Sequence, residues 1–455
     1  MRQWSRRAAL GLGVLGTVPL LAGRAAAAPE VTITDFGAVP GGDCTRAIND
    51  AIAARSAAGG GRVIVPGGRW HTGAIRLRSG VELHLEAGAT LLFSTDPAAY
   101  LPVVLTRWQG VEVYNYSPLI YADGEHDIAI AGQGVLDAQG DNAHWWPWIG
   151  SGQYGWQPGM PNQRDDWAAL ERMGVQGVPV SERVFGDGHY LRPSFVQPFR
   201  CRTVLISGVT IRNSPMWTIH PVYCDDVTIR DVRIESVGPN GDGCDPDSCE
   251  NVRVQRVTFA THDDCIAIKS GRDEDGRRVG IPSRNILVED CVFLSGGGAV
   301  AIGSEMSGGV SDVVARGLRL PFDPALGEAS NSFVLSVKST STRGGYMRNI
   351  SVSDVDCSAW TYVPVEVTFQ YSGGTGGTNY ADVSGIVARD WSVRGPCECP
   401  IRIRAVEAAP VHGVDLRDLA FAQAANPPLI QNTTDVTIRD VTVNGAPYQG
   451  AMTGK

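Results

Sequence analysis

Positive charge is scarce in this chain of 455 residues, which has 39 Lys and Arg against 48 Asp and Glu and a formal net charge of −9. A chain this acidic lacks the basic surface with which proteins neutralise phosphates, so we expect no nucleic-acid partner. Hydrophobic residues make up 43% of the sequence, which also lacks low-complexity tracts. This composition excludes a disordered protein and is sufficient for a large buried core.

Long apolar runs are also missing, with one short exception near the N-terminus. Residues 8–22 are apolar, follow a paired arginine at positions 6 and 7, and precede a run of alanines. This run is shorter than the ~20 residues that cross a bilayer, and its flanks are those of a signal peptide. We predict a signal peptide at residues 1–28, of the twin-arginine type, with the general secretion route as the alternative. The mature chain is expected to be secreted or extracytoplasmic, free of the membrane, and monomeric.

Paired CxxC motifs are absent, although the chain has ten cysteines. Structural zinc sites commonly use such pairs, so no zinc site is predicted. Several cysteines, among them Cys265, Cys291 and Cys357, fall within strand-like segments. Two alternatives stay open: disulfides, which can form outside the cytoplasm, and buried free thiols.

A repeat of two short alternating strands runs through most of the chain. Each copy alternates Val or Ile with polar residues, bends at Asp or Gly, and continues with a second alternating pair. Copies begin near residues 203, 226, 251, 285, 349, 385, 414 and 435. A unit this small cannot bury its apolar face alone, so neighbouring copies must stack. We therefore predict an all-β fold, a parallel β-helix; the rival propeller needs four strands in ~40 to 50 residues, more than most copies hold.

Two segments depart from the repeat. Residues 45–58 have apolar side chains on one helical face and end at three glycines, which predicts a helix that caps the open end of the stack. The repeat lapses from about residue 141 to 198, in a segment rich in tryptophan. Indole faces bind sugar rings, so these tryptophans form either the wall of a sugar site or a small core beneath a loop. We treat residues 29–455 as one catalytic domain that carries this insertion.

Acidic residues cluster in two consecutive copies of the repeat. Asp242 lies in a Gly- and Pro-rich segment with Asp245 and Asp247, and the pair Asp263-Asp264 follows one copy later. Residues one coil apart in a stack of strands lie about 4.8 Å apart. At least two of these carboxylates would therefore share one surface. Cleavage of a glycosidic bond needs one protonated and one ionised carboxyl group, and crowding separates their pKa values.

Other readings of these aspartates stay open. Aspartates in Gly- and Pro-rich segments are often turn formers, and Asp242, Asp245 and Asp247 are also hard oxygen donors that suit calcium. Neighbours in a straight strand point to opposite faces, so Asp263 and Asp264 can act together only if the chain bends there.

These residues resemble the signature of the polygalacturonase family, glycoside hydrolase family 28, which reads Asn-Thr-Asp, Asp-Asp, Gly-His-Gly and Arg-Ile-Lys. Asn240-Gly241-Asp242 is similar to the first motif and Asp263-Asp264 to the second, and similar flanking segments run from about residue 31 to 445. The resemblance implies a right-handed, pectin-lyase-like β-helix and hydrolysis with inversion, without a metal or other cofactor. It implies Asp263 as the general acid, and Asp242 and Asp264 as the residues that hold and activate water. The expected separation of acid and base is ~6.5 to 9.5 Å.

Two motifs depart from the family pattern. Gly296-Gly297-Gly298 stands where Gly-His-Gly is expected, and Ser336-Val337-Lys338 where Arg-Ile-Lys is expected. In the family these residues surround the cleavage point, and the basic pair is associated with galacturonate carboxylates. Serine carries no charge, and lysine is a point charge where arginine binds a carboxylate through two bonds. We expect weaker recognition of a uronate on the leaving-group side, unless Arg343 or another base compensates.

The sequence thus predicts a secreted glycoside hydrolase that cleaves α-glycosidic bonds of a pectic polysaccharide or oligosaccharide. The candidate substrate-binding residues are Asn240, Lys338, Arg343 and Tyr371. Tyr371 resembles a family tyrosine at the sugar site, although packing alone also explains a tyrosine there. A rhamnogalacturonan hydrolase is the alternative substrate choice. The alternative classes are a non-catalytic carbohydrate-binding β-helix and a β-helix lyase, which would use calcium and a basic residue.

Overall fold

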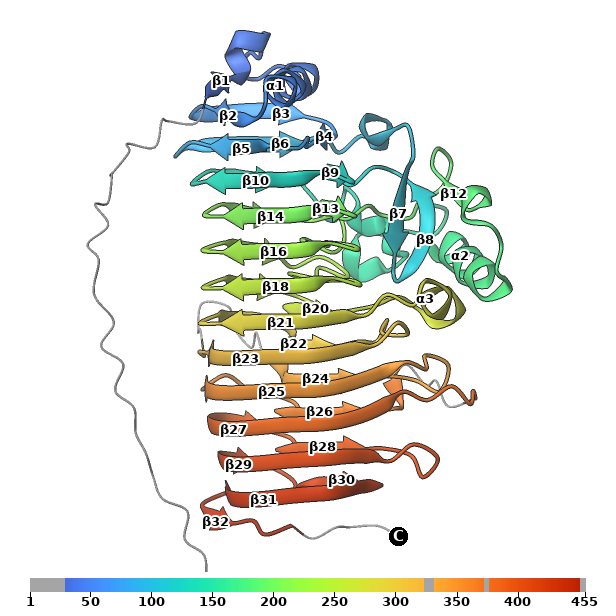
Figure 1. The fold of residues 1–455 in the computed structure, drawn as a ribbon, viewed down its shortest axis with the longest axis vertical. Coiled ribbons are helices and arrows are strands. Elements are labelled where there is room, and N and C mark those ends of the chain that lie inside the picture. The colour runs from blue at the N-terminus through green and yellow to red at the C-terminus, as the bar shows by residue number, and fades with distance from the viewer. Residues whose placement is uncertain (1–28, 323–330, 372–375, 451–455) are drawn as a thin grey trace, which may run out of the picture.

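The computed structural model describes residues 29–322, 331–371 and 376–450, so the predicted signal peptide at 1–28 lies outside the described residues. Figure 1 shows the chain as a tall stack of coils, with the N-terminal strands at one end and the C-terminal strands at the other. The prediction of a parallel β-helix is confirmed, and the propeller alternative is wrong.

Three ladders of parallel strands run along the stack. The first ladder comprises β1 (Glu30–Thr32), β2 (Gly61–Val65), β5 (Val81–Leu85), β10 (His126–Gly132), β14 (Arg202–Ser207), β16 (Asp225–Arg230), β18 (Glu250–Gln255), β21 (Ser283–Glu289), β23 (Val310–Leu320), β25 (Tyr346–Cys357), β27 (Asp382–Cys397), β29 (Val411–Ala424) and β31 (Thr433–Val443). The second comprises β3 (Gly68–Thr72), β6 (Ala89–Phe93), β11 (Val135–Asp137), β15 (Thr210–Arg212), β17 (Arg233–Ser236), β19 (Thr258–Thr261) and β22 (Val292–Ile302).

The third ladder carries the polar face on which the candidate site is built. It comprises β4 (Ile75–Arg76), β9 (Ile120–Asp123), β13 (Val196–Phe199), β20 (Ile266–Ile268), the second half of β22, β24 (Asn331–Lys338), β26 (Val365–Thr368), β28 (Ile401–Arg404) and β30 (Leu429–Gln431). Between β13 and β20, single bridges at Ile219 and Cys244 continue it.

The predicted bend between two strands takes two forms. In the earlier coils it separates strands such as β16 and β17, as the repeat indicates. From β23 onward one long strand runs through the bend, and in β25, β27, β29 and β31 the bend residue has a left-handed backbone with φ between 51° and 61°. These four residues are Asp354, Asp390, Asp418 and Asp440. Asp and Asn tolerate this conformation better than other residues with a side chain.

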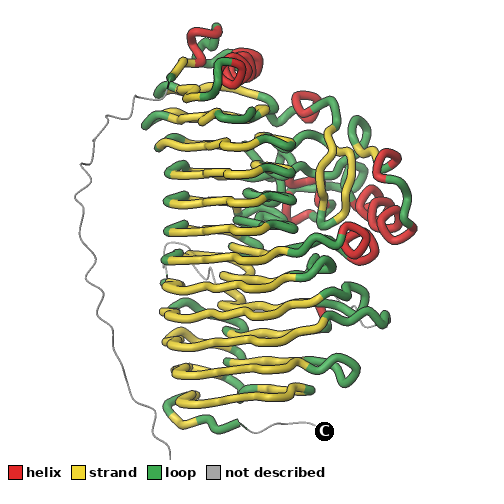
Figure 2. The backbone as a smooth tube through the Cα atoms, in the orientation of Figure 1, coloured by secondary structure: helices red, strands yellow, loops and turns green. Residues whose placement is uncertain are grey.

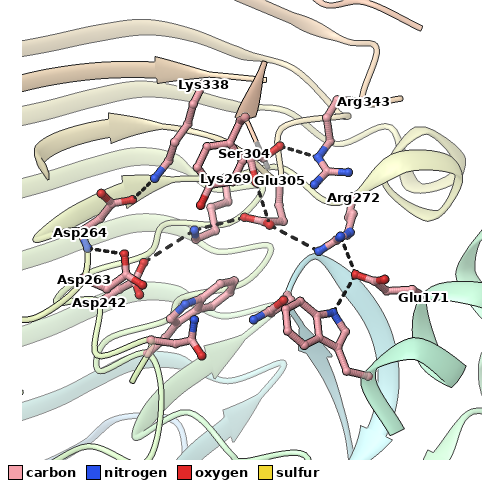
Figure 3. A pocket seen from close by; sticks show the side chains of 15 residues that line it. Glu171, Asp242, Asp263, Asp264, Lys269, Arg272, Ser304, Glu305, Lys338 and Arg343 are labelled. Atoms are coloured by element: carbon pink, nitrogen blue, oxygen red, sulfur yellow. Dashed lines mark hydrogen bonds and ion pairs between the residues drawn. The ribbon is translucent and has the colours of Figure 1, made fainter. Parts of the chain in front are cut away.

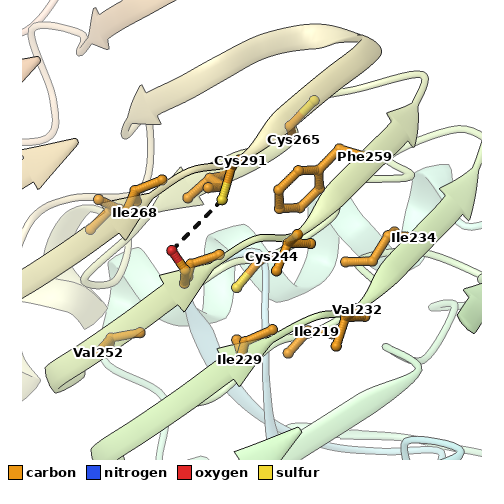
Figure 4. Packing of buried hydrophobic residues seen from close by; sticks show 14 of the residues in the cluster. Ile219, Ile229, Val232, Ile234, Cys244, Val252, Phe259, Cys265, Ile268 and Cys291 are labelled. Atoms are coloured by element: carbon orange, nitrogen blue, oxygen red, sulfur yellow. Dashed lines mark hydrogen bonds between the residues drawn. The ribbon is translucent and has the colours of Figure 1, made fainter. Parts of the chain in front are cut away.

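The interior of the stack is filled by Val, Ile and Leu from all three ladders, together with aromatic rings. Phe259 and Phe293 of adjacent coils stack with their centroids 5.3 Å apart and their planes 3° apart. Figure 4 shows Cys244, Cys265 and Cys291 among these side chains. All ten cysteines are buried free thiols, which confirms the second of the two alternatives.

The predicted capping helix is α1 (Thr45–Ala57), which lies over the N-terminal end of the stack in Figure 1. Its buried residues are Ala47, Ile48, Ala51 and Ile52, the face that the sequence indicates. The other two helices, α2 (Arg164–Gln176) and α3 (Asp273–Val279), stand beside the stack, as Figure 2 shows in red. They lie next to the hairpin of β7 (Val104–Trp108) and β8 (Val111–Asn115), and the short strand β12 (Val184–Phe185) pairs with β8. The last strand of the described residues is β32 (Ala446–Pro447), which pairs with β31.

The tryptophans of the insertion at 141–198 lie in two different settings. Trp145 and Trp146 are buried in the main core. Trp167, on α2, packs against Trp108 in a second apolar cluster and also faces the candidate site. The helix α2 therefore forms part of the wall of the cavity. Trp145 and Trp146 attach the start of the insertion to the main core.

Candidate active site

The stacking of coils places Asp242 and Asp264 in successive turns of the same ladder. Gly243 N donates to the carbonyl of Asp264 at 3.0 Å, and Cys265 N donates to that of Gly298 at 2.7 Å. Residues 262–265 lie between β19 and β20 and are not part of either strand. The bend that the pair Asp263-Asp264 requires is therefore present.

One carboxylate oxygen from each of Asp242, Asp263 and Asp264 lies within 4.8 Å of the others. The expectation of ~6.5 to 9.5 Å between acid and base is therefore wrong for the nearest oxygens. The reason is the coil spacing: residues stacked one turn apart have backbones about 4.8 Å apart, and their side chains follow them. The carboxylate groups of Asp242, Asp263 and Asp264 thus converge in one place.

The three aspartates open onto a cavity of about 290 Å³ (Figure 3). All four residues named from the sequence as substrate contacts line it as well. The lining residues are Gln109, Trp167, Glu171, Trp217, Asn240, Asp242, Asp263, Asp264, Lys269, Arg272, Ser304, Glu305, Lys338, Arg343 and Tyr371. The predicted site is thus assembled in one place, and about half of its wall comes from residues that the motifs did not indicate.

Lys338 contacts Asp264 directly, through an ion pair between Nζ and Oδ2. Burial raises the pKa of Asp264, and the positive charge of Lys338 partly opposes that rise. Burial also disfavours the charge on Lys338, but the neighbouring Asp264 carboxylate raises the lysine pKa. The ring of Tyr371 lies 5.0 Å from Lys338 Nζ, so the tyrosine packs on the lysine at the mouth of the cavity.

Lys269 is the central residue that the sequence motifs missed. Its buried Nζ lies 3.8 Å from Asp242, 3.4 Å from Asp245 and 3.3 Å from Glu305, and 4.3 Å from the centre of the Trp217 ring. Burial opposes the charge on Lys269, but the surrounding carboxylates, led by Glu305, raise its pKa well above the usual value. A signal was available: after the bend, Ala267 and Lys269 alternate with the core residues Ile266 and Ile268, so Lys269 faces the aspartate side.

Asp242 is buried among other charged groups. Burial raises its pKa well above the usual value, and the charges of Asp263 and Asp245 raise it further, while Lys269 lowers it. Its Oδ1 has no hydrogen-bond partner among the described residues. Glu305, on the far side of Lys269, is buried too, but the charges of Lys269, Arg343 and Arg272 outweigh burial and lower its pKa.

Asn240 and Arg343 line the cavity with some of their polar atoms already engaged. Asn240 Oδ1 accepts a 2.7 Å hydrogen bond from the buried Arg192. Arg343 Nη1 donates to both oxygens of Asp273, at 2.7 and 2.8 Å, and its Nε donates to the carbonyl of Ser304 at 2.8 Å. Arg343 thus shapes the wall while its charge is paired.

The calcium alternative for Asp242, Asp245 and Asp247 is not supported, because these three side chains do not form one group of ligand oxygens among the described residues. Asp247 accepts from Arg107 Nη1 at 2.9 Å and from Gly271 N at 3.0 Å, on the interior side of the loop. Asp245 is fully buried behind Lys269. Asp242 instead joins Asp263 and Asp264.

The two departures from the family motifs have different structural settings. A Cβ at Gly297 would lie 3.2 Å from both the amide nitrogen and Oδ1 of Asp264, so the glycine lets this coil lie directly against the acidic pair. Ser336 is buried, and its Cα pairs with that of Glu366 in the next coil. Neither residue carries charge into the cavity.

The chain is similar to a known protein family and to several of its members. Residues 187–437 match the family described as glycosyl hydrolases family 28. A probable polygalacturonase of Vitis vinifera is 32% identical over 71% of this chain, and an exo-poly-alpha-D-galacturonosidase of Dickeya chrysanthemi is 28% identical over 78%. The chain spans about 60% of the length of each of these two relatives.

A solved structure matches nearly the whole chain. The hyperthermoactive exopolygalacturonase of Thermotoga maritima is 42% identical, with a TM-score of 0.86 over 92% of this chain and 93% of that one. The family match includes all three aspartates and Lys338, and the structural match extends over nearly the whole β-helix. The chain therefore belongs to the glycosyl hydrolases of family 28.

Proposed function

We propose that this protein hydrolyses α-glycosidic bonds of a pectic galacturonan, with Asp242, Asp263 and Asp264 as its catalytic residues. The observation that carries the proposal is the convergence of one oxygen from each carboxylate within 4.8 Å at the floor of a cavity. The names of the relatives, a polygalacturonase and two enzymes with exo action on galacturonan, support the choice of substrate.

Each aspartate has a distinct proposed role. Asp263 gives its proton to the glycosidic oxygen as the bond to the leaving sugar breaks. A water held between Asp242 and Asp264 attacks the anomeric carbon and gives its proton to this carboxylate pair. Lys338 holds Asp264, and Lys269 supplies positive charge beside Asp242, and each lysine opposes the rise in pKa that burial causes in the carboxyl group next to it.

We further propose inversion at the anomeric carbon. A separation of ~5 to 5.5 Å is typical of retaining pairs, in which one carboxylate attacks the sugar. Here three carboxylates converge, so two of them can hold a water while the third acts as the acid. The stereochemical outcome is decided by the product, as described at the end of the Discussion.

The walls of the cavity support exo action, which we include in the proposal. Trp167 and Glu171 of α2 and Gln109 of the β7–β8 turn stand beside the aspartates. A cavity of about 290 Å³ lies at the small end of the ~300–1,000 Å³ common for ligand pockets, which suits a chain end better than a chain that passes through. We propose that the end of the polysaccharide enters this pocket.

The protein is proposed to act outside the cytoplasm, on the strength of the signal-peptide pattern at residues 1–28. Within the part of the chain that the structure describes, no helix is both long and apolar enough to cross a membrane.

A panel of defined oligosaccharides tests the substrate and the acid together. We expect hydrolysis of galacturonate oligomers, and a loss of about 10²- to 10⁴-fold in kcat for Asp263→Asn, because the amide cannot donate the proton. Asp354→Asn is the matched control, since Asp354 is an exposed bend residue on β25 and Asn suits its backbone. A preference for rhamnogalacturonan oligomers would favour the alternative substrate, and a loss below tenfold for Asp263→Asn would contradict its role.

A further inference from the structure

A polar and aromatic surface continues the candidate site along the stack, beyond the residues that line the cavity. Asp264 is followed in the next coil by Gly298, whose Cα pairs with that of Phe333 one coil further on. A Cβ at Gly298 would lie 3.1 Å from Asp264 Oδ1 and 3.8 Å from Phe333 Cβ. The absence of a side chain at Gly298 therefore lets the acidic pair lie close to the coil that carries the Phe333 ring.

The aromatic ring at Phe333 begins a continuous series of contacts. Its centroid lies 6.5 Å from that of Tyr362 in an edge-on arrangement, and the Arg402 guanidinium lies 4.8 Å from the Tyr362 ring centre. Tyr362 is 40% exposed, and Trp360 beside it in the same loop is 42% exposed. Large exposed aromatics on a folded surface commonly mark a binding site.

Two arginines in this region share a single buried carboxylate. Glu366, 2% exposed, accepts from Arg402 Nε at 2.9 Å and from Arg404 Nη2 at 3.2 Å. Two guanidinium groups on one carboxylate leave one positive charge in excess. Arg404 Nε is buried and has no hydrogen-bond partner among the described residues. The Arg404 side chain as a whole is 33% exposed, so the exposed part of its guanidinium group can meet a second anion.

The register aligns these arginines with the lysine of the candidate site. Lys338 pairs with Thr368, and Thr368 pairs with Arg404, so Arg404 lies two coils from Lys338 on the same outward face. Two coils correspond to about 10 Å. A second row of outward-facing side chains runs parallel to this one. In it Ser336 pairs with Glu366, and Glu366 pairs with Arg402. An arginine at position 336 would compete with Arg402 for Glu366.

We propose that Tyr362, Arg402 and Arg404 form a second uronate-binding site, which holds a galacturonate unit of the chain that emerges from the cavity. The guanidinium groups bind the sugar carboxylate, and Tyr362 packs against the ring. The charge missing at Ser336 is thereby supplied two coils further along the stack. This inference rests on the proposed function, because it takes the ligand to be a galacturonate chain.

The site predicts a dependence on chain length, measured as kcat/KM for galacturonate dimers to pentamers. In the wild type kcat/KM rises once the oligomer is long enough to reach the arginines. Arg404→Gln removes this rise, with a loss of about 10- to 100-fold on the longer oligomers, as expected for a lost charge-assisted hydrogen bond, and leaves the dimer unchanged. Because Arg402 still pairs with Glu366 in this variant, folding is preserved. Tyr362→Ala should lower kcat/KM for the longer oligomers in the same way and leave kcat/KM for the dimer unchanged.

Arg439→Gln is the matched control, because Arg439 is an exposed arginine on β31. An Arg404→Gln variant with wild-type kcat/KM on every length, or with an equal loss on every length, would overturn the second site. A wild type that cleaves no galacturonate oligomer of any length would instead overturn the proposed function. The two failures are therefore distinguishable.

Discussion

At the scale of single residues, charge balance around the aspartates governs the proposed chemistry. Asp242, Asp263 and Asp264 are crowded, and burial raises the pKa of both Asp242 and Asp264. Lys338 forms an ion pair with Asp264, and Lys269 lies beside Asp242. These two cations oppose protonation of the crowded carboxyl groups, and an ionised carboxylate is what activates water.

Replacing Lys269 should move the acid limb of the pH profile. The positive charge lowers the pKa of Asp242, so its removal in Lys269→Met raises that pKa further, and the ionised base is lost at a higher pH. We expect the acid limb of kcat/KM to shift toward higher pH by about one unit or more. Lys269→Arg, which keeps the charge, is the control and should retain most of the wild-type profile. An acid limb that stays in place in Lys269→Met would show that this charge does not tune the base.

The motifs in the sequence indicate which side chains lie together, and their roles stay predictions. Asp242, Asp263, Asp264 and Lys338 lie together, as their motif positions indicate. Lys269 and Glu305 were missed because neither stands in a signature motif. Their partners come from other coils, and only the register of β20 against its neighbours brings them together.

At the scale of elements, the bend residues decide whether each coil can stack on the next. The repeat indicates a bend at Asp or Gly, and this is where the left-handed residues of β25, β27, β29 and β31 occur. What the repeat did not predict is the merging of two short strands into one from β23 onward. Short alternating patterns specify the facing of side chains but contain no signal for where hydrogen bonding is interrupted.

Asp418 provides a clean test of the bend. It is exposed on β29 and has φ 53°. A β-branched side chain is strained in this conformation, so Asp418→Val should lower the free energy of unfolding by about 1–2 kcal/mol. Asp418→Asn keeps a residue that tolerates the conformation and should change it by less than about 0.5 kcal/mol. Urea unfolding checks both; equal stability of the two variants would mean that the bend imposes no such constraint.

At the scale of the whole molecule, the stack turns a sequence repeat into a site. Asp242 and Asp263 are 21 residues apart in the sequence and lie close together because one coil separates them. The repeat therefore predicts both the fold and the position of the aspartates in it. The walls could not, since α2 and the β7–β8 hairpin lie outside the repeat. Their position beside the aspartates depends on packing between Trp108, Trp167 and their neighbours, which has no periodic signature in the sequence.

The configuration of the first product tests the central claim, hydrolysis by three converging carboxylates with a water held between two of them. Proton NMR during the first turnovers on an α-linked galacturonate oligomer should show a saturated product whose new reducing end has the β configuration, opposite to that of the bond cleaved. A first product with the α configuration would mean that one aspartate attacks the sugar directly, and an unsaturated product would mean elimination; either result would contradict the account.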